Sequence, residues 1–297
     1  MIFLLCSILF IAGCAVAFRF SADRGCKPIG VNFAFRLCSG VIGTTVMVVS
    51  LRDEGFSGIP LAVWGWAFVG GVFFWSAGYA NLRASGLGHL GITWSVTRCA
   101  MVMAVIASVV AWHEIPLSVD SAALWVTAAG VLLTGAALIL FGIDRLHAGQ
   151  NNRKQHGSRL WATWLAGAFL LQGGWEVSLR AAGSFEADRY RAVYIGTVFF
   201  TAMVLSAATL FAKRIRMGRG EWLYGGLAGV CSVLGSGLRP YAVRELPGVF
   251  VFPVTAVGIM LLTQAASAMI WKSRLGRWGW LGVLAAGAAV FLLAGVR

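Results

Sequence analysis

Ten long apolar runs constrain this chain more than any other feature of its sequence. A helix of about 20 residues, rising 1.5 Å per residue, crosses the roughly 30 Å hydrocarbon core of a bilayer. Backbone groups in lipid must be hydrogen-bonded within the chain, so each run is expected to be helical. We therefore predict an all-α, polytopic membrane protein with ten transmembrane helices. The runs cover approximately residues 2–18, 29–51, 60–82, 86–112, 119–143, 160–180, 192–212, 221–243, 246–271 and 278–296.

Composition agrees with a chain that faces lipid. Of 297 residues, 59% are hydrophobic and only 12% are charged, which is more apolar content than one soluble core of this length hides. The 38 glycines fit helices that approach closely, and the 13 tryptophans fit anchoring at the membrane interface. We expect an integral, multi-pass protein of the bacterial inner membrane.

The formal net charge of +13 does not indicate nucleic-acid binding. Basic residues occupy short loops between apolar runs and form no continuous stripe, so anionic lipid headgroups are the expected partner. Loops that alternate to one side hold fifteen Lys and Arg residues, and those on the other side hold six. Because basic loops favour the cytoplasm, the charges predict the richer side inside the cell and both termini outside.

The chain reads as two related halves. The one extended polar stretch, residues 144–159, follows the fifth run. A shift of 161 residues aligns Arg19 with Arg180 and Arg83 with Arg244, each at equivalent run ends. The predicted units are a first five-helix repeat (1–143), a linker (144–159) and a second repeat (160–297). Because five crossings are an odd number, the second repeat enters from the opposite face, as in many secondary transporters.

Two turns and one helix start resemble the EamA-type members of the drug/metabolite transporter superfamily. Residues 112–117 (WHEIPL) match the family's acidic turn at Glu114, whereas residues 271–275 (WKSRL) carry Ser273 at the equivalent position. Residues 246–253 (LPGVFVFP) resemble the start of the family's ninth helix. The resemblance implies ten helices in two halves, both termini in the cytoplasm, and export of a metabolite, amino acid or drug-like compound.

Charges within the runs are the candidate site residues, since burying one costs about 2.5–3.5 kcal/mol on insertion scales. Arg98 lies near the middle of the fourth run. One interpretation makes Arg98 a donor to a substrate carboxylate or phosphate; the other makes it a structural partner of Glu176. Glu176 either carries a coupling proton or pairs with Arg180 one turn away.

Further candidates have milder alternatives. Arg36 lies two turns into the second run and either meets substrate or extends to the interface, and Arg239 is interfacial. Gln264 hydrogen-bonds across helices or to substrate. The aromatic candidates, which line a cavity or pack structurally, are Trp94 and Trp175.

The function predicted from the sequence is secondary transport, with Arg36, Trp94, Arg98, Trp175 and Gln264 binding substrate and Glu176 coupling H+. The buried arginines favour a carboxylate-bearing small molecule. Alternatives are a non-catalytic assembly or signalling subunit and, less favoured, a membrane-embedded enzyme, for which no nucleophile with a base is evident. No GxxxxGK[ST] loop occurs, and the six cysteines form no CxxC pair, so we expect no cofactor and no metal.

Overall fold

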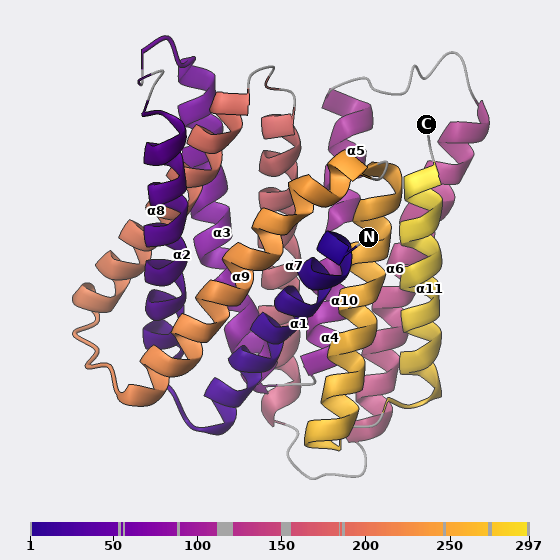
Figure 1. Ribbon diagram of the computed structural model, residues 1–297. Helices are drawn as coiled ribbons and strands as arrows, with labels where there is room; N and C mark the ends of the chain where they lie inside the picture. Colours follow the sequence, from indigo (N-terminus) through magenta and orange to yellow (C-terminus); the bar gives the residue numbers. More distant parts are fainter. Residues whose placement is uncertain are drawn as a thin grey trace.

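The computed structural model describes residues 2–52, 55, 57–87, 90–111, 121–149, 156–183, 185, 188–245, 248–272 and 275–295. Within these ranges the protein consists of helices and contains no strand, which confirms the prediction of an all-α fold (Figure 1). The helices are α1 (Ile2–Asp23), α2 (Pro28–Ser50), α3 (Leu61–Leu87), α4 (Leu90–Cys99), α5 (Met101–Ala111), α6 (Ser121–Gly149), α7 (His156–Gly183), α8 (Asp188–Ala212), α9 (Arg219–Glu245), α10 (Gly248–Trp271) and α11 (Arg277–Gly295).

The fourth predicted run differs from the prediction, because it forms two short helices, α4 and α5. At the junction, the Ala100 amide donates to the Thr97 carbonyl at 3.3 Å and the Met103 amide to the Ala100 carbonyl at 3.0 Å. Each bond joins an amide to the carbonyl three residues earlier, as in a 3₁₀-helix, and this makes the turn tighter than in an α-helix. The Thr97 hydroxyl also donates to the Thr93 carbonyl, at 3.1 Å. No Pro or Gly marks this break, so the sequence gives no sign of it.

In the polar stretch 144–159, α6 continues to Gly149 and α7 begins at His156.

Four helices are long and apolar enough to cross a membrane: α1, α2, α3 and residues 190–212 of α8. Shorter apolar stretches cover residues 128–141, 255–271 and 277–292. Large apolar side chains also lie on the outside of the bundle, with Leu61 83% and Met269 75% exposed. Outward-facing apolar surface of this extent fits a membrane protein.

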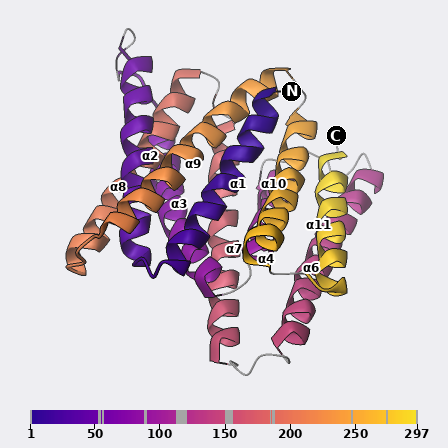
Figure 2. The same cartoon turned by 60° about the horizontal axis from the view of Figure 1, so that its bottom comes forward.

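Helix packing joins elements that are far apart in the sequence (Figures 1 and 2). The most extensive pairings are α1 with α9, α3 with α7, α2 with α8, and α6 with α11. Next come α2 with α9 and α3 with α8. Each of these pairs takes one helix from before residue 150 and one from after it, so the two halves of the chain interlock.

Glycines allow some of these close approaches. A Cβ on Gly225 of α9 would lie 2.6 Å from the Val31 carbonyl oxygen, and one on Gly229 would lie 2.7 Å from that of Phe35. Backbone atoms cannot swing aside as a side chain can. The glycines therefore bring α9 directly against α2, as their abundance in the sequence suggested.

Connections between α1 and α2, α8 and α9, and α10 and α11 lie at the same end of the bundle, at the bottom of Figure 1. The Glu221 carboxylate joins two of them, because it accepts from the Lys27 amide at 3.1 Å and from the Gly218 amide at 2.8 Å. It thereby caps α2 and α9 together. At the other connection, the Gly276 amide donates to Asp144 at 3.2 Å.

Candidate functional site

Arg36 is the most deeply buried charged side chain that the structure describes. It lies two turns into α2, and only 1% of its surface is exposed. The side chain therefore turns into the bundle. Extension to the membrane interface, one of the two interpretations from the sequence, does not occur. A cation in this position needs partners supplied by the protein or by a ligand.

Two aromatic rings hold the Arg36 guanidinium. Its central carbon lies 4.1 Å from the ring centre of Phe35 and 3.7 Å from that of Phe74, and its Nη2 donates to the Phe74 carbonyl. Phe74, on α3, also packs against Trp175 of α7 at 5.0 Å and Phe199 of α8 at 5.2 Å between ring centres. Phe74 thus joins the arginine to the second half of the chain.

Gly78 provides the space for this arrangement. A Cβ on Gly78 would overlap Nη2 of Arg36 and lie 3.2 Å from Oδ1 of Asn32. The Nε and Nη1 atoms of Arg36 and the Oδ1 atom of Asn32 are buried without a hydrogen-bond partner among the described residues. We call Asn32, Arg36, Phe35, Phe74 and Gly78 together the Arg36 site. It holds unused donors on a buried cation.

Arg98 occupies a different setting, at the end of α4 beside the helix break. It is half-buried, and its guanidinium lies 5.2 Å from the ring centre of Trp94. The carbonyl end of a helix carries partial negative charge, which favours a cation there. Trp94 is 4% exposed, and its Nε1 has no hydrogen-bond partner among the described residues.

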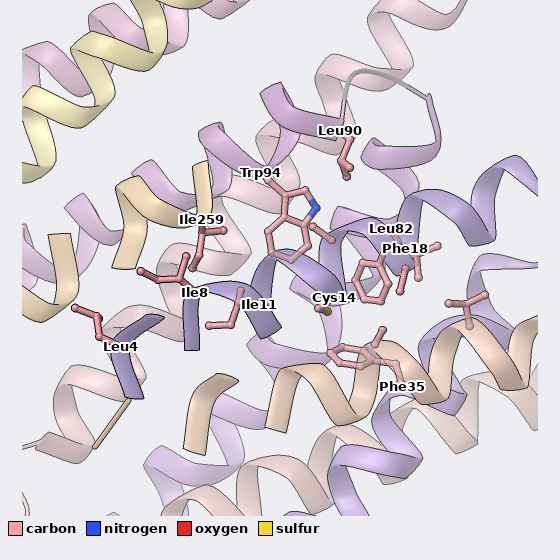
Figure 3. Close-up of a cluster of buried hydrophobic side chains, with 14 residues drawn as sticks. Leu4, Ile8, Ile11, Cys14, Phe18, Phe35, Leu82, Leu90, Trp94 and Ile259 are labelled. Atoms are coloured by element: carbon pink, nitrogen blue, oxygen red, sulfur yellow. The ribbon is translucent and has the colours of Figure 1, made fainter. Parts of the chain in front are cut away.

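Cys14 of α1 lies in the region between the two arginines' aromatic neighbours, Phe35 and Trp94 (Figure 3). The thiol of Cys14 lies within electrostatic range of both Arg36 and Arg98. In Figure 3, Cys14 and Phe18 lie between Trp94 and Phe35. The ring centre of Phe18 is 5.2 Å from that of Phe35 and 6.4 Å from that of Trp94. One aromatic layer therefore connects the surroundings of both cations.

Glu176, on α7, is half-buried and accepts a hydrogen bond from Nε2 of Gln172 at 2.8 Å. Among the described residues this polar partner is an amide of the same helix and not an arginine. The neighbouring Trp175 stacks on Tyr194 at 6.3 Å, in addition to its contact with Phe74. The structure thus places Trp175 beside the Arg36 site.

Gln264 is buried on α10 and donates to the Ser95 hydroxyl of α4 at 3.4 Å. This contact between helices is one of the two roles foreseen for it. The turn residues Glu114 and Ser273 and the side chain of Arg239 lie outside the described residues. Among the residues that are described, no group of three His, Cys, Asp or Glu side chains is placed to hold a metal ion.

Of the Arg36 site, sequence reasoning identified Arg36 itself and missed the other four residues: Asn32, Phe35, Phe74 and Gly78. The run Phe73-Phe74-Trp75 in the third apolar segment was an available signal, because an aromatic ring face attracts a cation such as a buried arginine. Gly78 carried no such signal among 38 glycines. Its role depends on the approach of α2, which a single sequence does not reveal.

Comparisons with known proteins concern the fold alone. No family model matches the chain, and no curated protein matches it. A solved structure described as "Crystal structure of protein" is similar over 100% of this chain and 98% of its own, with a TM-score of 0.58 and 17% identity. The fold and the apolar helices together define the class: an all-helical protein with helices suited to crossing a membrane.

Proposed function

We propose that this chain is a secondary transporter of the EamA type, within the drug/metabolite transporter superfamily. It moves a small metabolite, amino acid or drug-like compound outward across the bacterial inner membrane. The chain crosses the membrane ten times, as two inverted five-helix halves, with α4 and α5 together forming the fourth crossing. Alternating access arises because the two halves exchange conformations around a buried site.

The pattern of contacts between helices carries the proposal, because the same pairings result when the first half of the chain is exchanged with the second. If the order of helices in the first half maps onto that in the second, α1 corresponds to α7, α2 to α8, α3 to α9 and α6 to α11. The pairing of α1 with α9 then becomes that of α7 with α3, and the pairing of α2 with α9 becomes that of α8 with α3. Both members of each exchanged pair occur, and α2–α8 and α6–α11 map onto themselves. A two-fold relation between halves supports a transporter of this design.

Buried cations between the halves are the second support. A signalling or assembly subunit has no need for a buried arginine where α2, α3, α7 and α8 meet, and among the described residues no carboxylate pairs with Arg36 there. Buried ionisable groups in membrane proteins mark substrate or ion pathways by default. An embedded enzyme would require a nucleophile and a base together, and the described site has neither.

Reconstitution tests the proposal. The full-length protein in liposomes is expected to exchange a labelled compound from a panel of amino acids, organic acids and neutral drugs against the same unlabelled compound inside. Exchange stimulated from the opposite side is the signature of alternating access, and a signalling subunit does not produce it. A pH gradient applied in parallel tests coupling to H+ through Glu176. If no compound of the panel is exchanged, the transporter proposal fails.

A further inference from the structure

From the geometry of the Arg36 site, we propose that this site binds the carboxylate of an organic monoanion and that Gly78 is the residue that positions the arginine for it. The proposal deepens the proposed function, because it names the class of substrate and transfers the anion-binding role from Arg98 to Arg36.

Unused donors on a fully buried cation carry the argument. Arg36 is 1% exposed, and one nitrogen, Nη2, donates to the Phe74 carbonyl. The other two, Nε and Nη1, have no hydrogen-bond partner among the described residues. Buried polar groups in proteins are nearly always paired, and each exception calls for an explanation. An anion that enters the bundle supplies both the missing acceptors and the missing negative charge.

The surrounding rings select the shape of that anion. Phe35 and Phe74 lie against the guanidinium at 4.1 Å and 3.7 Å, so contacts to a ligand are left to its nitrogen edge. A planar carboxylate matches donors on the edge of a guanidinium. Phe74 continues into Trp175 and Phe199, and Phe35 into Phe18, so the environment suits an apolar or aromatic body on the same molecule. Arg36 pairs with no carboxylate among the described residues, and a single cation of this kind favours a ligand with a single negative charge.

Arg98 is less suited to this role. It is half-buried, it lies over one ring at 5.2 Å, and it has the carbonyl end of α4 beside it. Its positive charge is therefore already partly balanced. Both arginines lie within electrostatic range of Cys14, so Arg98 adds to the positive potential near the site without being the primary contact.

Gly78 determines whether the Arg36 guanidinium occupies this position. A methyl group there would overlap Nη2 and crowd Oδ1 of Asn32, which forces the guanidinium out of its place between the rings. Gly65, on the same helix, has open space where its Cβ would lie, with nothing within 4 Å. Gly78→Ala and Gly65→Ala therefore form a matched pair with the same chemical change and the same cost in helix geometry.

The experiment measures thermal unfolding of the full-length protein in detergent with benzoate, phenylacetate, hexanoate and 4-methylpentanoate, each against its neutral amide. Ligands that bind the folded state raise the Tm in proportion to the logarithm of their concentration. At least one carboxylate at millimolar concentration is expected to raise the Tm while its amide does not. Gly78→Ala should weaken the apparent affinity at least tenfold, and Gly65→Ala should leave it unchanged.

Arg36→Met provides the independent measurement. Without ligand, this variant is expected to unfold at a higher temperature than the natural protein, because it removes a buried charge that pairs with no carboxylate in the part of the chain that the structure describes. Its Tm should no longer respond to carboxylates. A lower Tm or a failure to fold would assign Arg36 a structural role and overturn the proposal. So would equal binding of acid and amide, or no response to any of the four acids.

Inorganic phosphate serves as a further probe, since a larger Tm response to phosphate than to every carboxylate would overturn the choice of a carboxylate. The outcomes also separate this inference from the proposed function. If carboxylates bind but no compound is exchanged in liposomes, the anion site is supported and the transporter proposal is rejected. If only neutral compounds are exchanged, the transporter proposal is supported and the anion site is rejected.

Discussion

Arg36 and Arg98 are both arginines within apolar segments, yet the protein accommodates them in different ways. Arg36 lies in an unbroken helix, is 1% exposed and has two aromatic rings against it. Arg98 lies where α4 ends, is half-buried and has one ring at 5.2 Å. Aromatic faces stabilise the first cation, and a helix end stabilises the second. The comparison shows that the burial of a charge within a span depends on its neighbours in space.

The largest expected effect concerns Arg36 itself. We expect Arg36→Gln to lower substrate exchange in liposomes about 100-fold, since a hydrogen bond to a charged group is worth about 1.5–3 kcal/mol and each 1.4 kcal/mol is tenfold. The matched control is Arg52→Gln. Arg52 is exposed and lies just after the C-terminal end of α2, so this variant should retain full exchange. Comparable loss in both variants would remove the distinction between buried and exposed arginines.

Removal of the ring that joins the two halves comes next. Phe74→Leu is expected to destabilise the protein by about 2 kcal/mol, because it removes a desolvated cation–π contact and three aromatic pairs, with Phe35, Trp175 and Phe199. The measurement is denaturant unfolding in detergent. Phe68→Leu, on the same helix but 57% exposed, should change stability by less than about 0.5 kcal/mol. Equal effects would mean that Phe74 contributes only apolar bulk.

A smaller effect is expected at the helix break. Arg98→Gln should reduce exchange about tenfold, because the cation is half-buried and partly balanced by the end of α4. The double variant with Arg36→Gln tests whether the two regions act together. Since both arginines lie within electrostatic range of Cys14, we expect the combined loss to be less than the product of the single losses. A multiplicative loss would make the two regions independent.

Glu176 distinguishes proton coupling from substrate binding. Glu176→Gln keeps an acceptor for the Gln172 amide and removes the titratable group. Exchange without a gradient is expected to fall less than about threefold, while the stimulation by a pH gradient disappears. The measurement is uptake with and without the gradient in the same liposomes. Persistent stimulation in the variant would contradict the coupling role.

Orientation is tested without any expected change in activity. From the charge distribution, a cysteine introduced at Arg153 should not react with an impermeant reagent in intact cells, because the basic end faces the cytoplasm. Ser57→Cys, at the opposite end of the bundle, should react readily. Cys26→Ser removes a native thiol from the basic end in both cases. Reversed labelling would instead match the orientation that the family resemblance implies.

The sequence by itself predicted the helices, because a helix satisfies the backbone hydrogen bonds of a long apolar run within the run itself. Nine of the ten predicted runs correspond to one helix each, and charges within the runs identified Arg36, Arg98 and Glu176 as exceptional residues. Local composition suffices for such predictions, since the cost of burial falls on each residue separately.

Only the tertiary structure decided which cation is fully buried and how it is held. The Arg36 site is assembled from α2 and α3, with Trp175 and Phe199 of α7 and α8 behind Phe74. Gly78 matters only because the guanidinium of another helix occupies the volume of its absent side chain. The break between α4 and α5 is likewise a product of packing, since no local residue requires it. Contacts between distant segments carry no periodicity along a single chain, and for this reason the sequence alone did not reveal them.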